Sequence, residues 1–122
     1  MAMKEKTNPL EYDNVFKAGG RFAYYAELER VKVPDGGLNI GSLLKENAGN
    51  YEFVAGDPTA VLATDVLNAT GAEITVMTPV CKSGAVIALG VTYAGGDTYT
   101  TVKKSLENSH IDIIMGKEMN NG

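Results

Sequence analysis

The sequence predicts a single α+β domain that is mainly β, with one helix near its C-terminal end. Its 122 residues fit one domain with a core of its own. Its fourteen glycines favour a turn-rich β architecture over a helix bundle. The stretch Ala55–Gly71, around which the chain is organised, has the composition of a short apolar strand held between two sharp turns.

The N-terminal part of the chain predicts an arm followed by a compact domain. Residues 1–14 are polar and charged and contain Pro9, so we expect a flexible arm there and one compact domain over residues 15–122. The aromatic run Arg21–Ala26 is typical of a strand, but it could equally open a short helix through Glu29. Periodicity does not separate the two over so short a window.

The next segments predict short strands separated by turns. Val31–Val33 and Leu38–Ile40 alternate apolar and polar residues on either side of a turn at Pro34–Gly37. Tyr51–Val54 predicts another strand. The strands on either side of the loop Glu46–Asn50 form the best hairpin candidate in the chain.

The central stretch divides into a turn, a strand and a second turn. Gly56–Pro58 predicts the first turn, Ala60–Ala63 a buried strand and Asn68–Gly71 the second turn. Asn68–Thr70 is formally a glycosylation sequon as well. Because the N-terminus lacks the apolar core of a signal peptide, we expect these residues to form a turn only.

The segment after the second turn predicts two strands with a turn between them. Glu73–Thr78 alternates cleanly, and Pro79 is expected to end this strand or to place it at a sheet edge. Cys81–Gly84 predicts a turn, and the apolar run Ala85–Leu89 should be buried.

One helix is expected near the C-terminal end. It begins at Asp97 or Thr98, either of which can cap its N-terminus, and Asn108 is the expected stop. Ile111–Met115 predicts a last strand, followed by a tail. The apolar stripe of the helix should pack on the sheet that holds Val61 and Leu62, and it consists of Tyr99, Val102 and Leu106.

Composition and charge exclude several classes of function. The net charge is −4, and residues 1–30 carry as many positive as negative charges, so no basic stripe points to nucleic acid as a partner. No apolar run approaches the roughly 18 residues that a membrane span needs. The chain is therefore expected to be made and kept in a cytoplasm.

No constellation of residues predicts catalysis, metal binding or a cofactor. The one cysteine, Cys81, and the one histidine, His110, could meet only by tertiary accident. Asp57, Asp65 and Asp97 match no calcium-loop spacing, and Asp57 and Asp97 have local roles as turn and cap residues. The sequence therefore predicts a protein that is not an enzyme.

The order of features from Gly36 to Met115 resembles the head decoration proteins of tailed bacteriophages. This lambda-type capsid-stabilising family includes relatives that form the bases of head fibres. The features that carry the resemblance are, in order, the Gly41–Leu44 segment, a hairpin ending in Tyr51–Val54, a strand and turn from Ala60 to Gly71, a Val102–Leu106 helix and an isoleucine-rich strand at Ile111–Met115.

The resemblance implies a particular architecture and location. The fold would be a small β-clip or β-tulip-like barrel or sandwich, with one helix in the C-terminal region and an extended N-terminal arm. It would stand as a homotrimer on the outer capsid surface of the virion, bound to the major capsid protein, with the arm contacting the shell. The chain would decorate or stabilise the head without catalysing a reaction.

Two groups of residues are candidates for contacts with partners. Laid on a partner, the arm could supply an extended edge, with Leu10 and Tyr12 on one face. Alternatives remain open: another virion component, such as a tail or connector protein, or a small ligand-binding or enzymatic β domain. The expected capsid-binding residues are Lys4, Lys6, Pro9, Leu10 and Tyr12, and the aromatic group that forms either a contact surface or part of the core is Phe22, Tyr24 and Tyr25.

Overall fold

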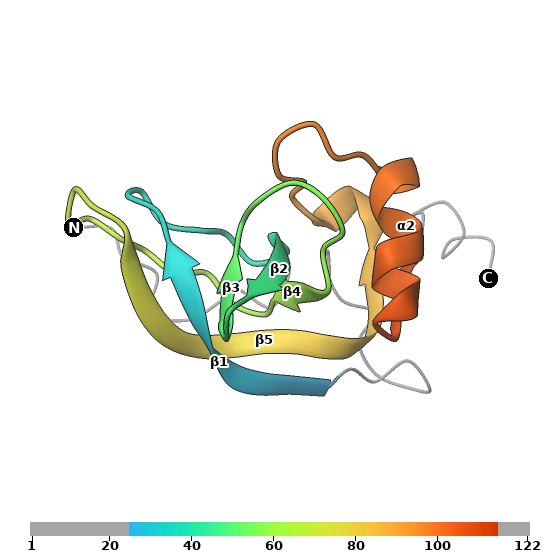
Figure 1. Ribbon diagram of the computed structural model, residues 1–122, viewed down its shortest axis with the longest axis horizontal. Helices are drawn as coiled ribbons and strands as arrows, with labels where there is room; N and C mark the ends of the chain where they lie inside the picture. Colours follow the sequence, from blue (N-terminus) through green and yellow to red (C-terminus); the bar gives the residue numbers. More distant parts are fainter. Residues whose placement is uncertain (1–24, 115–122) are drawn as a thin grey trace.

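Five strands close into a barrel in the computed structural model, which describes residues 25–114 (Figure 1). The barrel order is β1-β3-β2-β4-β5, and β5 pairs back with β1; β6 lies outside the barrel, parallel to β5. The predicted fold class, mainly β with one helix near the C-terminal end, is confirmed. The elements are β1 Tyr25–Val33, β2 Leu43–Asn47, β3 Asn50–Glu52, β4 Ala60–Leu62, β5 Ile74–Ile87, the 3-10 turn η2 Ala88–Gly90, α2 Tyr99–Asn108 and β6 Ile111–Ile114.

The strand β4 is buried on both faces, as its unbroken apolar run predicts. Ala60 and Leu62 pack into the barrel interior, whereas Val61 and Ala63 pack on the opposite side, against the helix. All three residues of the strand are fully shielded from solvent. The central stretch of the sequence is therefore the wall between two hydrophobic cores.

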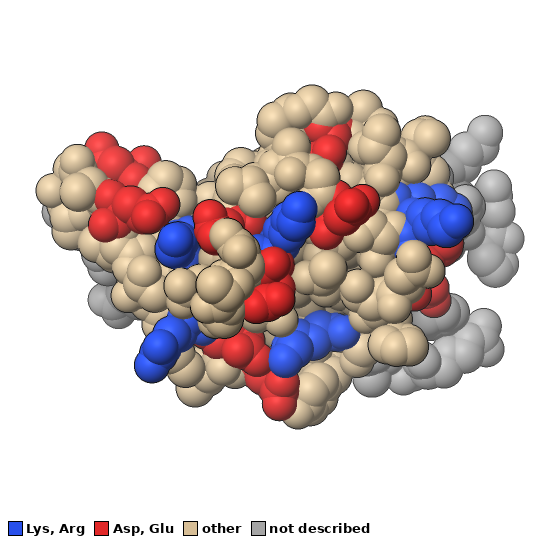
Figure 2. Space-filling model, in the orientation of Figure 1, with Lys and Arg blue, Asp and Glu red and all other residues tan. Residues whose placement is uncertain are grey.

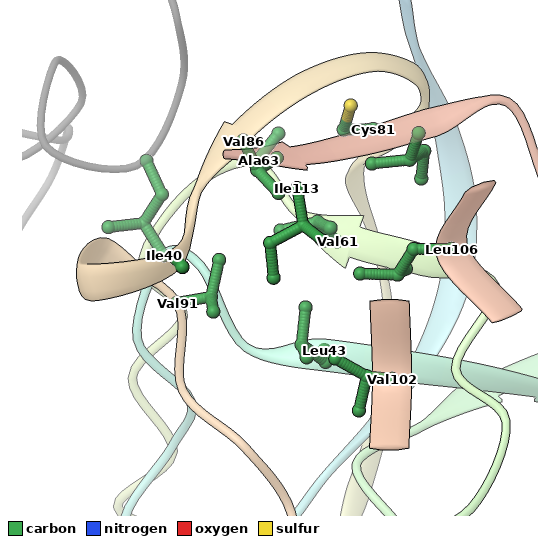
Figure 3. Packing of buried hydrophobic residues seen from close by; sticks show 12 residues of the cluster. Ile40, Leu43, Val61, Ala63, Cys81, Val86, Val91, Val102, Leu106 and Ile113 are labelled. Atoms are coloured by element: carbon green, nitrogen blue, oxygen red, sulfur yellow. The ribbon is translucent and has the colours of Figure 1, made fainter. Parts of the chain in front are cut away.

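The helix α2 covers the outer core. Val102 and Leu106 are fully buried, and Figure 3 shows them pointing toward Leu43 and Val61. The helix therefore packs on the sheet that holds Val61 and Leu62, as predicted, and it contacts the side of Val61, because Leu62 faces the barrel interior. The buried residues of this outer core are Ile40, Leu43, Val61, Ala63, Cys81, Val86, Ala88, Val91, Val102, Leu106, Ile111 and Ile113.

The N-terminal end of α2 is held by a capping box and by the loop before β4. Thr98 is the cap residue, and its side chain accepts a hydrogen bond from the amide of Thr101. Asp97 has another role, because its carboxylate accepts hydrogen bonds from the Gly56 amide at 3.0 and 3.2 Å. Ser105 donates to the carbonyl of Pro58 at 2.8 Å, so the turn before β4 is tied to the helix.

The long strand β5 contradicts the predicted turn at Cys81–Gly84 and, of the two alternatives for Pro79, the end of a strand, because both lie inside β5. The Pro79 carbonyl accepts a hydrogen bond from the Ala63 amide at 3.1 Å, just past the last residue of β4. The N–H and C=O groups of one strand residue point to the same side. An N–H at the position of Pro79 would therefore point past the end of β4 and away from β1. Because proline lacks this N–H, no hydrogen bond between β5 and β1 is lost.

Gly84 marks the point where β5 changes partners. Up to Ser83 the strand pairs with β1, and from Gly84 onward it pairs with β6. Gly84 has a φ of 129°, in a region that other residues rarely adopt, and its amide donates to the carbonyl of His110 at 3.0 Å. The turn-like composition of this segment thus produces a bend within one strand.

The hairpin prediction is confirmed, with a tighter turn than expected. Asn47 pairs with Asn50, which leaves only Ala48 and Gly49 in the loop, with φ values of 53° and 87°. Positive φ at both central positions is the geometry that matches the twist of two-residue hairpins. The strand β3 then ends at Glu52, two residues earlier than predicted.

In two other segments the structure decides between predicted alternatives or differs from the predicted strand. Tyr25 and Ala26 belong to β1, so the strand alternative holds for this described part of the aromatic run and the helix through Glu29 does not form. Leu38–Ile40 is not a strand, because only Leu38 pairs, in an isolated bridge to Val66. The segments come so close that a side chain on the preceding Gly37 would lie 2.3 Å from the Val66 carbonyl oxygen.

Asn68 joins the turns at one end of the barrel. Its side chain is buried, and its Nδ2 lies within hydrogen-bond distance of three carbonyls, those of Val33, Pro34 and Ala72. Its Oδ1 accepts from the amide and hydroxyl of Thr70. The sequon therefore forms a turn, as predicted, and its amide is fully engaged in the fold.

Replacing Leu106 tests the packing of the helix. Leu106→Ala should lower the free energy of unfolding by about 2–5 kcal/mol, the usual cost of emptying a buried leucine site. Lys104→Ala, on the exposed face of α2, should cost less than about 0.5 kcal/mol. Urea denaturation of the two variants measures both values, and equal losses would contradict this placement of the helix.

Replacing Asn68 tests the hydrogen-bonded turn at the end of the barrel. Asn68→Ala should lower the free energy of unfolding by about 2–4 kcal/mol, because it leaves several backbone groups without their partner. Asn39→Ala is the matched control, since Asn39 is exposed, and it should change stability by less than about 0.5 kcal/mol. Thermal and urea unfolding compare the two; similar stabilities would count against the role of Asn68.

Candidate docking surface

Strands β1 and β5 pair into a two-stranded ribbon. The outer side of this ribbon, which faces away from the barrel interior, exposes large apolar side chains. Leu28 is 63% exposed and Met77 58% exposed. Leu28 lies opposite Pro79 and Arg30 lies opposite Met77, so the four residues form one contiguous patch on two paired strands. We call these four residues the ribbon face. An exposed apolar cluster of this kind is more informative than single exposed hydrophobic residues, because it often marks an interaction site.

The ribbon face includes one basic residue, Arg30. The exposed Arg30 side chain makes no ion pair within residues 25–114. Its neighbour along the strand on the same side, Lys32, lies 3.8 Å from the Glu52 carboxylate. Figure 2 shows Lys and Arg interspersed with Asp and Glu over the visible face of the molecule. The ribbon face therefore combines an apolar centre with a cationic rim.

The other side of the same ribbon carries a linked polar cluster. Lys82 bonds Glu29 at 2.8 Å and Glu27 at 2.9 Å, and the Tyr25 hydroxyl donates to Glu27 at 2.7 Å. The hydrogen bonds from Tyr25 and Lys82 lower the pKa of Glu27. The bonds to Glu29 and Glu27 raise the pKa of Lys82, and the Glu27 carboxylate raises that of Tyr25. The two sides of the ribbon thus differ sharply in chemistry.

Most residues predicted to contact a partner lie outside the described part of the chain. Tyr25 is the exception: it is 55% exposed and belongs to the polar cluster, so it is not a core residue. Sequence reasoning missed Leu28 and Met77, although Met77 stands on the side of its strand opposite Ile74 and Val76. The candidates outside residues 25–114 are Lys4, Lys6, Pro9, Leu10, Tyr12, Phe22 and Tyr24.

Cys81 and His110 occupy different environments. Cys81 is fully buried in β5, where burial raises the pKa of its thiol to about 11. Its Sγ donates to the carbonyl of Ser83 at 3.3 Å. His110 is exposed in the turn after α2, with a φ of 68°. The raised pKa keeps Cys81 a neutral thiol near pH 7, which suits a packing role.

The three aspartates considered as metal ligands have separate local surroundings. The Asp65 carboxylate accepts a hydrogen bond from the Ile40 amide at 2.8 Å, and Asp97 binds the Gly56 amide. Asp57 is exposed in the turn before Pro58, with a φ of 42°. Within residues 25–114, no group of three or more His, Cys, Asp or Glu side chains is placed to hold a metal ion.

Comparison with known proteins adds no family assignment. Searches against protein-family models, curated proteins and solved structures each found no match. In the described part of the chain, no helix has both the length and the apolar character needed to cross a membrane.

The burial of Cys81 predicts slow thiol labelling. A thiol whose pKa is about 11 is only about 0.1% thiolate at pH 8, and burial blocks the reagent as well. An aromatic disulfide reagent should therefore label the folded chain at least about 100-fold more slowly than the chain in denaturant. Labelling at equal rates would show that Cys81 is accessible.

Proposed function

We propose that the chain is a bacteriophage virion structural protein that binds the outer capsid surface and decorates or stabilises the head. The observation that carries the proposal is the order of sequence features, which resembles that of head decoration proteins, together with an exposed apolar surface suited to docking. The major capsid protein is the partner, and the chain stands on the shell as a homotrimer.

The segments that carry the resemblance lie mostly in the strands and the helix of the domain. Gly41–Leu44 leads into β2, Tyr51 lies in β3, and Ala60–Gly71 comprises β4 with the turn that follows it. Val102–Leu106 lies in α2 and begins and ends with its two buried residues, and Ile111–Ile114 is β6. All of these segments build one barrel and the core beneath its helix, as expected if the resemblance reflects a common fold.

The ribbon face supplies the folded part of the contact. Leu28 and Met77 would bury apolar surface against the shell, and Arg30 would pair with an acidic residue there. Repetition of the same contact over a symmetric shell raises the apparent affinity through avidity. The arm would add contacts by ordering on the shell, with Leu10 and Tyr12 in one row.

The test uses heads of the phage that encodes the chain, assembled without it. Leu28→Asp with Met77→Asp should weaken binding to the heads by more than about tenfold, because charge replaces the apolar centre of the contact. Deleting residues 1–13 should also weaken it, while circular dichroism shows that the domain stays folded. Co-sedimentation measures the affinities, and a reconstruction of decorated heads should show trimers at threefold positions.

Val54→Asp is the matched control, because Val54 is an exposed apolar residue that belongs to neither β1 nor β5, at 42% exposure. It should bind heads like the unchanged chain. Binding that survives both the ribbon-face substitutions and the deletion would contradict the proposed contact. A chain that never binds heads, although folded, would refute the proposed function itself.

A further inference from the structure

Most of β1 has an unpaired edge in the described part of the chain. The strand pairs with β5 along its whole length, from Tyr25 to Val33. On its other side, β3 pairs only with Val31 and Lys32. Among residues 25–114, no strand therefore borders the segment Tyr25–Arg30 on that side, as the lower part of β1 in Figure 1 illustrates.

Pro79 reveals which backbone groups stand on this edge. Pro79 lies opposite Leu28 and has no N–H, so the two cannot exchange the pair of bonds that a hydrogen-bonded position requires. The N–H and C=O of Leu28 must then point away from β5, and alternation places those of Ala26 on the same edge. The amides of Glu27 and Glu29 point the other way and bond β5.

The side chains beside this edge favour a basic strand. Glu27 and Glu29 lie on one side of β1, and both bond the single ammonium of Lys82. Two carboxylates and one ammonium leave an excess negative charge on that side. A strand added here would gain from basic residues at alternate positions, because these would lie beside the two glutamates.

We propose that Met3–Thr7 of the same chain binds the open edge of β1 as an added strand. Lys4 and Lys6 are two residues apart, so in an extended strand they share one side and match the spacing of Glu27 and Glu29. Glu5 then stands on the other side, near Arg30. Native proteins commonly cover an exposed sheet edge, which otherwise invites pairing with other molecules.

The connection is long enough for pairing within one chain. Residues 8–24 lie between the two segments and span up to about 55 Å when extended, whereas the open edge is about 20 Å long. A tether of this length corresponds to an effective concentration of about a millimolar. This inference concerns the free chain and does not depend on the proposed role on a phage head.

Residue-resolved amide hydrogen exchange tests the pairing. In the full chain, the Leu28 or Ala26 amide should exchange at least about tenfold more slowly than in a chain lacking residues 1–13, because an added strand accepts its hydrogen bond. The Glu27 and Glu29 amides bond β5 and should be equally protected in both chains. Equal exchange at both edge amides in the two chains would overturn the proposal.

Reversing the charge of Lys6 tests whether Met3–Thr7 is the segment that binds the edge of β1. Lys6→Glu should reduce the protection of the edge amides to the level of the truncated chain, whereas the matched control Lys104→Glu, on α2, should leave it unchanged. Protection that survives Lys6→Glu would overturn the pairing with the two glutamates. Protection that disappears on dilution, together with a dimer in sedimentation, would show that a second copy supplies the strand and would overturn pairing within one chain.

Discussion

The pairing of β1 with β5 is the interaction on which the rest of the structure depends. It joins nine consecutive residues of β1 to β5, and it closes the sheet because both strands also border the short strands β3 and β4. Without it, the remaining strands of three to five residues would form an open sheet too small to bury its interior. The barrel therefore depends on a contact between segments that are far apart in the sequence.

The same ladder explains why the chain has two cores. Val31 and Val80 face into the barrel, while Ala26 and Cys81, on the opposite side of the same two strands, contribute to the core beneath the helix. Because side chains alternate along a strand, one set of strands serves both cores without a second sheet. The helix and β6 then need to cover only the outer side of β2, β4 and β5.

Local signals predicted the helix, β4 and most turns, because the forces that form them act within a few residues. The stripe of Val102 and Leu106 and the glycine of the hairpin are of this kind. The course of β5 could not be predicted in this way. Pro79 is tolerated inside β5 because β4 ends beside it. Gly84 lies at a bend because β5 begins to pair with β6 at this residue.

The candidate surface was missed for a related reason. The exposure of Leu28 and Met77 follows from the register of β1 on β5, and neither residue signals it alone. Once the register is known, the ribbon shows two properties that single strands cannot have. Its outer side carries the ribbon face, and its edge beside two glutamates carries backbone groups that no strand within residues 25–114 pairs. Side chains and backbone therefore offer different chemistry to a partner, and an extended segment could occupy the edge while the ribbon face stays open.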